Sequence, residues 1–216
     1  MTIMGKSNSL GGSICAYTPN TILFDGKNGD TKEVNLKKGY YYIRAQGAGG
    51  GGGNCGVYGV GGGGGSGAGF EGIIKISDNL NNINCYAGIA PQSNRKSGEA
   101  SYIGDIIKLG GGIVGYTDNG GAGAGGSLTI SEQLQITSCQ IKSNGYSGNS
   151  VVNGTTLRSG ANSVLTNNGG GIAKGTFEER CATAPGAGGA GGKQWDLDGG
   201  YGMYGEVKIQ YLKPKP

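Results

Sequence analysis

Glycine occupies 51 of the 216 positions of the chain, against a share of about 7% in ordinary proteins. The glycines cluster in runs such as residues 49–53 and 61–65, so the strict every-third-residue repeat of collagen is absent. Disordered chains combine low hydrophobicity with high net charge and few aromatic residues. Here the net charge is only +4, charged residues make up 15%, and there are twelve tyrosines. The composition therefore predicts an ordered chain with unusual secondary structure.

Apolar residues between the glycine runs alternate with polar ones, which is typical of half-buried strands. In residues 40–46, Tyr41, Ile43 and Ala45 fall on one face and the intervening residues on the other. No segment has a convincing helical period of 3.6 residues. Strands are expected at 21–24, 34–36, 40–46, 73–76, 80–87, 102–109, 128–130, 134–136, 139–141 and 206–212. The pattern predicts an all-β antiparallel sandwich.

The glycine runs gather in three blocks that suit neither helix nor ordinary sheet. Glycine fills 15 of the 23 residues in 47–69, 9 of 17 in 110–126 and 9 of 20 in 186–205. A chain without side chains can adopt a threefold helix of the polyproline II type, which has no internal hydrogen bonds. Several such rods could pack side by side and satisfy each other's backbone groups. The glycines expected to lie inside these rods include Gly51, Gly63, Gly111, Gly121 and Gly189.

The domain organisation follows from these blocks. We expect an N-terminal extension at residues 1–20, a single glycine-rich sandwich domain at 21–212 and a short tail at 213–216. The polar stretch 144–168 predicts a loop-rich insertion, because it contains the turn dipeptides Asn144-Gly145, Asn153-Gly154 and Asn168-Gly169. The inter-strand loops at one end of the sandwich would be drawn out into the glycine rods.

The order of these segments resembles a known pattern. An alternating strand ends in glycine at 42–53, a second run follows at 61–69, then residues 98–104 with Ser101, and the chain closes with the strand 202–211. This is similar to the glycine-rich domain of bacteriophage tail-fibre and tail proteins, including adhesin tips built on polyglycine helices. It also resembles the glycine-rich domain of anaplastic lymphoma kinase. The resemblance implies a tumour-necrosis-factor-like or jelly-roll sandwich with an inserted polyglycine II bundle.

Composition also argues against several classes of protein. The chain has no histidine, the most frequent general base and a common metal ligand, so we expect no enzyme, cofactor or metal. The mild positive charge is spread out and does not indicate nucleic acid. The N-terminal residues lack the apolar core of a signal peptide, and no run of 18 apolar residues occurs. We expect synthesis in the cytoplasm without a signal peptide, and no membrane insertion.

The five cysteines are far apart and form no CxxC pair. Because their number is odd, they cannot all pair within one chain, and free thiols in a reducing cytosol are the favoured interpretation. A single disulfide remains an alternative. The cysteines are Cys15, Cys55, Cys85, Cys139 and Cys181.

Three motif matches carry little weight. Residues 67–72 satisfy G-x-G-x-x-G, but they precede a predicted strand, whereas a dinucleotide fingerprint precedes a helix. Asp196 and Asp198 begin no complete calcium loop, and a solvated turn is favoured. Glu178 and Glu179 would point apart in an extended segment, so they do not suggest paired carboxylate chemistry.

Aromatic and apolar residues that interrupt or end the glycine blocks are the binding candidates. A glycine rod has no side chains with which to recognise a ligand, whereas exposed Tyr and Trp in loops are common binding anchors. In the alternative interpretation, these rings pack on the rods and seal the bundle. The candidates are Val57, Tyr58, Tyr116, Trp195, Tyr201 and Tyr204.

Together these features favour a non-enzymatic receptor-binding or adhesion domain of a phage tail fibre or a similar surface structure. Its location would be the virion or the extracellular space, and its partner a host cell-surface glycan or outer-surface protein. A homotrimer or attachment to a fibre is expected by analogy with tumour-necrosis-factor-like sandwiches. The alternatives are a structural or capping domain without a host ligand, and ice binding, which the broken glycine runs disfavour.

Overall fold

The computed structural model describes residues 17–55, 60–91, 96–117, 121–150, 159–172, 176–192 and 198–214. Ten strands and one short helix are assigned within these residues. The strands are β1 Tyr17–Lys27, β2 Thr31–Leu36, β3 Gly39–Gln46, β4 Gly69–Ile76, β5 Leu80–Tyr86, β6 Ser101–Ile103, β7 Ile107–Leu109, β8 Leu128–Ile130, β9 Gln135–Ser143 and β10 Glu206–Pro214. The helix α1 is Phe177–Arg180.

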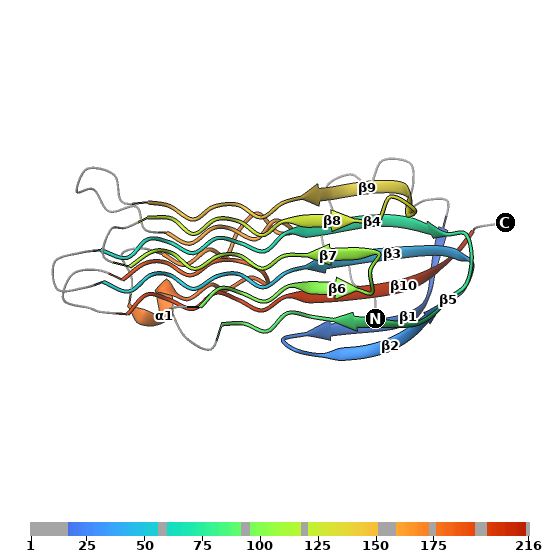
Figure 1. Cartoon of the computed structure of the whole chain (residues 1–216), viewed down its shortest axis with the longest axis horizontal. Helices are drawn as coiled ribbons and strands as arrows, with labels where there is room; N and C mark the ends of the chain where they lie inside the picture. The colour runs from blue at the N-terminus through green and yellow to red at the C-terminus, as the bar shows by residue number, and fades with distance from the viewer. Residues whose placement is uncertain are drawn as a thin grey trace.

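The strands form two five-stranded antiparallel sheets that pack as a sandwich, as predicted. One sheet has the order β1-β10-β3-β4-β9 and the other β2-β5-β6-β7-β8. The sheets occupy one half of an elongated molecule (Figure 1).

The core of the sandwich is built from the inward positions of both sheets. In β3 the buried residues Tyr41, Ile43 and Ala45 alternate with half-buried ones, which confirms the facing expected from the sequence. Facing them, the second sheet contributes fully buried side chains such as Leu36 and Ile103 to the same apolar cluster. Burial of these side chains provides the main stabilisation, at about 25 cal/mol per Å² of apolar surface.

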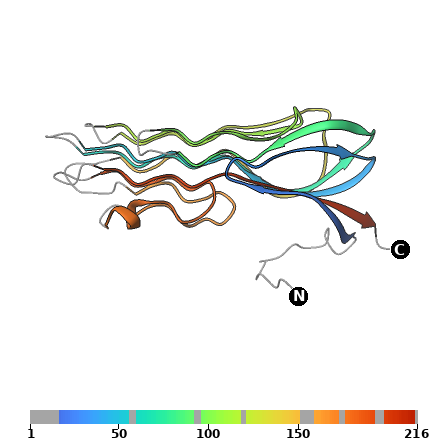
Figure 2. The same cartoon turned by 90° about the horizontal axis from the view of Figure 1, so that it is seen from below.

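The other half of the molecule consists of the glycine segments, which run side by side along its long axis in both views (Figures 1 and 2). Apart from α1, no helix is assigned in the described residues, so the segments do not form a bundle of α-helices. Their backbone groups bond to neighbouring segments, as the sequence predicts. Four consecutive N–H groups, those of residues 49–52, donate to the carbonyls of Met203, Gly65, Lys96 and Gly200 at 2.8–3.0 Å, which lie on three different segments, the first and the last on the same one.

Contacts between a given pair of glycine segments recur every third residue. In the first series the N–H groups of Gly47, Gly50 and Gly53 donate to the carbonyls of Ala68, Gly65 and Gly62. In the second, those of Gly61, Gly64 and Gly67 donate to Gly192, Gly189 and Gly186. In the third, those of Gly62, Gly65 and Ala68 donate to Tyr116, Ile113 and Gly110. In each of these three series, a segment therefore bonds to the same neighbour at every third residue.

Side chains are excluded where these segments touch. A Cβ atom built on Gly52 would lie 1.9 Å from the carbonyl oxygen of Ala190, and one on Gly65 would lie 2.0 Å from that of Ala124. Both neighbours are backbone atoms held in hydrogen-bonded segments, so neither can swing aside as a side-chain end could. Glycine is required here by close approach of two backbones.

Several details differ from the sequence expectations. β1 begins at Tyr17, inside the expected N-terminal extension. The expected strands 134–136 and 139–141 are one continuous strand, β9, which pairs with β4 through two register irregularities. The expectation of an extended segment at Glu178 and Glu179 is wrong, because both lie in α1, where Thr176 and Glu179 form a reciprocal capping box. No helix within the described residues is long and apolar enough to cross a membrane.

Candidate functional site

Buried polar side chains join the sandwich to the glycine segments. Ser101, at the start of β6, donates its hydroxyl to the carbonyl of Gln46 at 2.7 Å and accepts the N–H of Gly88 at 2.9 Å. The side chain of Gln46 lies 2.8 Å from the hydroxyl of Ser163, and its amide also reaches Val164 N–H and Pro185 O. Because Gln46, Ser101 and Ser163 are fully buried, these bonds fix where the glycine segments leave the sheets.

The glycine segments reverse direction together at the end farthest from the sheets. Hydrogen bonds join Gly53 to Gly62, Gly62 to Tyr116, Tyr116 to Gly121, and Gly192 to Gly53. These residues flank the connections after Cys55, Thr117 and Gly192, so three connections lie at one end, which we call the loop end. At the opposite end of the sandwich, Tyr17 of β1 pairs with Pro214 of β10. The two ends of the molecule therefore differ: three connections between glycine segments lie at the loop end, and β1 begins and β10 ends at the opposite end.

Of the six binding candidates, Tyr116 fits the expected position best. It lies at the loop end, and 59% of its surface is exposed. Tyr201 is 39% exposed, but its ring packs edge-on against Phe177 at 5.2 Å between centroids. Tyr204 is half-buried and its carbonyl bonds Gly186, near the sandwich. Val57, Tyr58 and Trp195 lie outside the described residues.

The five glycines expected inside the rods all lie within the hydrogen-bonded segments. Gly51 donates to Lys96 and accepts from Gly115, Gly63 donates to Asn149, and Gly189 donates to Gly50. Gly121 accepts the N–H of Tyr116. A Cβ on Gly111 would lie 2.0 Å from the carbonyl oxygen of Gly98, and one on Gly189 2.1 Å from that of Gly200. These residues form the scaffold beneath the loop end.

A small aromatic cluster with α1 flanks the segment that carries Tyr201. The guanidinium of the buried Arg180 lies 6.0 Å from the centroid of the Phe177 ring, a distance at which cation–π attraction operates. The carbonyl of Arg180 accepts Ala190 N–H, and Cys181 Sγ accepts Tyr201 N–H. The ring of Tyr201 thus packs against a side chain of α1, whereas the alternative interpretation expected it to pack on the glycine rods.

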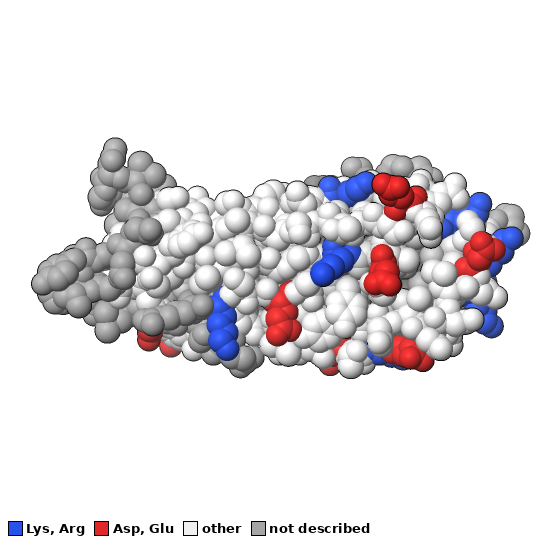
Figure 3. Space-filling model, in the orientation of Figure 1, with Lys and Arg blue, Asp and Glu red and all other residues white. Residues whose placement is uncertain are grey.

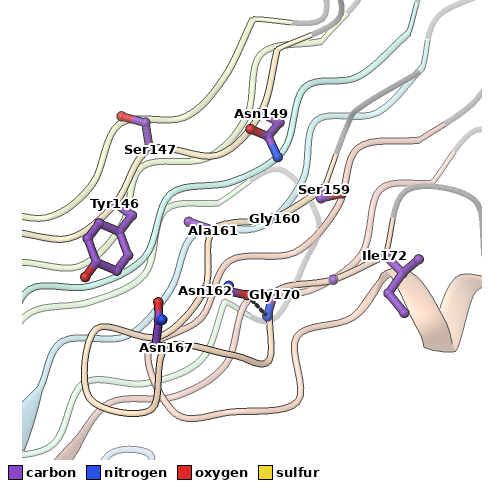
Figure 4. Close-up of a pocket in the computed structure, with 11 residues that line it drawn as sticks. Tyr146, Ser147, Asn149, Ser159, Gly160, Ala161, Asn162, Asn167, Gly170 and Ile172 are labelled. Carbon is purple, nitrogen blue, oxygen red and sulfur yellow. Dashed lines mark hydrogen bonds between the residues drawn. The ribbon is translucent and has the colours of Figure 1, made fainter. Parts of the chain in front are cut away.

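A shallow groove of about 550 Å³ lies beside the glycine segments, between residues 146–149 and 159–172 (Figure 4). Its walls carry uncharged polar side chains, among them Asn149 and Asn167, and the ring of Tyr146. This groove was not predicted from the sequence. The available signal was the abundance of Asn and Ser in the expected insertion, but nothing in the sequence places residues 146–149 opposite 159–172.

Among the described residues, most charged side chains lie on the sandwich half of the molecule (Figure 3). On the face in Figure 3, most Lys, Arg, Asp and Glu side chains lie over the sheets, and most of the described glycine half is uncharged. On the outer face of the first sheet, Arg44 bridges Glu71 at 3.2 Å and Glu206 at 3.0 Å. Tyr42 donates to Glu71, and burial together with this carboxylate raises the pKa of the Tyr42 phenol. These ionic groups link neighbouring strands of the first sheet and lie away from the loop end.

Metal ligands and thiols are the reactive groups of interest within the described residues. No cluster of three or more Cys, Asp or Glu side chains suited to a metal occurs among them. Burial raises the pKa of the Cys85 thiol to about 12, so this buried group is no nucleophile at neutral pH. Cys139 and Cys181 are also free thiols. Comparison of the chain with protein-family models and with curated protein sequences finds no match.

Proposed function

We propose that this protein is a non-enzymatic receptor-binding domain of a phage tail fibre or a similar virion or cell-surface structure. The observation that carries the proposal is that the two ends of the molecule differ: three connections between glycine segments lie at the loop end, and β1 begins and β10 ends at the opposite end. Such an arrangement suits attachment through the sandwich and presentation of the loop end. The resemblance of the glycine pattern to phage tail-fibre domains supports the same function.

In this proposal the glycine segments are polyglycine II helices and the sandwich is of the tumour-necrosis-factor-like jelly-roll type. A threefold helix with no internal hydrogen bonds directs successive N–H groups to different neighbours and returns to the same neighbour after three residues. The three-residue hydrogen-bond series between neighbouring segments have this spacing. Because the segments are cross-linked on several sides, the bundle acts as a stiff platform for the loop end.

Tyr116 is the leading contact residue in the proposed site, with Val57, Tyr58 and Trp195 as further sequence-based candidates. An exposed tyrosine on a rigid support provides amphipathic contact area at a low cost in conformational entropy. Affinity per copy would be modest and would rise with the number of copies on a fibre or in a homotrimer. The partner would be a host glycan or an outer-surface protein, in the extracellular space.

The second candidate function is a structural or capping domain with no host ligand. The contact between the rings of Tyr201 and Phe177 favours it, because a ring packed within the molecule has less surface left for a ligand. A capping domain would tolerate changes at the loop end as long as the fold persists. Substitution of exposed residues at that end therefore separates the two functions.

The test compares attachment of labelled protein to host cells for the wild type, Tyr116→Ala, and the triple variant that adds Tyr58→Ala and Trp195→Ala. Ile22→Ala is the matched control, because Ile22 is 49% exposed on β1 in the sandwich. We expect the triple variant to lose attachment and the control to retain it, with unchanged melting temperatures. Normal attachment by a folded triple variant would remove these residues from the proposed site.

A further inference from the structure

The groove beside the glycine segments has a composition suited to one class of ligand. Eleven of the described residues line it, and none of these is Lys, Arg, Asp or Glu. Such a lining offers no counter-charge to an anion or a cation, and a buried unpaired charge is costly. A ligand of this groove is therefore uncharged and polar.

Several polar side chains of the groove have unused hydrogen-bonding capacity. Within the described part of the chain, no hydrogen bond is made by the side chains of Ser147, Asn149, Ser159 or Asn167. Asn162 uses its oxygen to accept Gly170 N–H at 3.2 Å, which leaves its amide protons available. Each asparagine amide offers two donors and an acceptor, and each serine hydroxyl both donates and accepts. This is the complement of a surface dense in hydroxyl groups.

Two apolar surfaces complete the groove. The ring of Tyr146 is 44% exposed and the side chain of Ile172 is 60% exposed, and they stand on different segments (Figure 4). A tyrosine ring provides flat apolar area with a polar tip. Sugars combine hydroxyl edges with C–H faces, so they match amides and hydroxyls next to an exposed ring.

The backbone beneath the groove is held in place before any ligand arrives. Ser66 anchors Tyr146 twice, by its N–H to the Tyr146 carbonyl at 2.9 Å and by its hydroxyl to the Tyr146 N–H at 2.8 Å. Asn149 accepts Gly63 N–H and donates to the carbonyl of Ser159, both at 3.0 Å. The two walls are thus tied to the same glycine segment and to each other. Such preorganisation lowers the entropy cost of binding.

We propose that this groove binds a neutral oligosaccharide, with the Tyr146 ring against a sugar face and the amides of Asn149 and Asn167 on its hydroxyl groups. This inference rests on the proposed receptor-binding function and assigns a second contact surface, on the flank of the glycine region, whose described lining does not include Tyr116. An extended saccharide chain on the host surface would then be held along the flank while the loop end makes its own contacts.

The experiment titrates ¹⁵N-labelled full-length protein with neutral hexasaccharides derived from dextran, mannan, cellulose and chitin, and with a heparin hexasaccharide as the anionic comparison. We expect at least one neutral hexasaccharide to shift amide resonances of residues 146–149 and 159–172. In the Tyr146→Ala and Asn149→Ala/Asn167→Ala variants, binding should weaken by about tenfold or more. Asn81→Ala, an exposed asparagine on β5, is the control and should bind as the wild type does.

Outcomes against the inference are specific. Four results would each overturn the groove assignment. Two concern the wild type and its ligands: binding of heparin alone, or no binding of any neutral hexasaccharide at millimolar concentration. The other two are amide shifts confined to the loop end and unchanged binding in folded groove variants. The proposed function fails separately, when wild-type protein attaches to no host cell. If cells are bound equally by the wild type and the groove variants and no neutral hexasaccharide is bound, the groove assignment alone is wrong.

Discussion

Neighbouring positions in one glycine segment have opposite tolerance for a side chain. Gly123 is buried, its N–H donates to Gly63 O, and a Cβ there would lie 2.1 Å from the carbonyl oxygen of Ile113. The next residue, Ala124, already carries a Cβ and is exposed. Side-chain size in this region is therefore set by which way each residue faces, position by position.

Gly123→Ala should destabilise the protein by about 2 kcal/mol or more, because overpacking against backbone forces two bonded segments apart. Ala124→Ser, the adjacent control, should change the free energy of unfolding by less than about 0.5 kcal/mol. Urea unfolding measures both. Similar small effects for the two variants would contradict close packing of the glycine segments.

The thiols of Cys85 and Cys139 should react at very different rates. Cys85 is buried in the core, and this burial raises the pKa of its thiol to about 12. Cys139 on β9 is exposed, although partial desolvation raises the pKa of its thiol as well. In folded protein at pH 8, iodoacetamide should label Cys139 well before Cys85, because only the accessible thiol can meet the reagent. Peptide mass spectrometry with a urea-unfolded control gives the ratio. Equal labelling in the fold would refute the burial of Cys85.

Tyr86 makes stability sensitive to alkaline pH. Burial and the hydrogen bond to Glu99 raise the pKa of its phenol to about 12 from an ordinary value of 10.0. The neutral phenol is favoured in the folded state, so its stabilising contribution is complete below pH 10 and is lost as pH rises toward 12. The melting temperature of the wild type should fall more steeply between pH 10 and 12 than that of Tyr86→Phe. If the melting temperatures of the two proteins fell in parallel over this pH range, the raised pKa of Tyr86 would be contradicted.

At the scale of elements, the start of β6 controls how the sandwich and the glycine segments meet. Ser101 is fully buried, and its hydroxyl donates to the carbonyl of Gln46 and accepts the N–H of Gly88. Ser101→Ala leaves a buried donor and a buried acceptor unsatisfied, so we expect a loss of about 2 kcal/mol. Ser127→Ala, at an exposed position directly before β8, is the control, at less than about 0.5 kcal/mol. Chemical denaturation measures the free energy of unfolding of both variants. An equal loss in the two would show that Ser101 does not have this role.

The elements also show what a sequence of this kind can predict. Strands such as β3 and β10 follow from alternating side chains, because one face is buried. The glycine segments were predictable as close-packed backbone, since no other packing suits their composition. α1 was not, because four residues are too few to show a helical period and its capping box lies in a polar stretch. The groove was not predictable either, because it depends on which glycine segments are neighbours.

At the scale of the whole molecule, a charged sandwich continues into a glycine half whose described residues show few charges on the face in Figure 3. The backbone of that half is cross-linked at three-residue intervals, and its chain reversals share one end with Tyr116. Stiffness is the property that this arrangement provides, and under the proposed function recognition is left to the few side chains at the loop end and along the groove. Those side chains are the places where related chains could change ligand without changing the scaffold.

The central claim, that the protein binds a host surface, is tested most directly by saturation binding of fluorescently labelled wild-type protein to a broad panel of bacterial cells. Light scattering after size exclusion on the same sample gives the oligomeric state and hence the valency. We expect saturable binding to a restricted group of cells, and competition by unlabelled wild type but not by the loop-end triple variant. A well-folded sample that binds no cell in the panel would contradict the claim and favour a structural fibre domain.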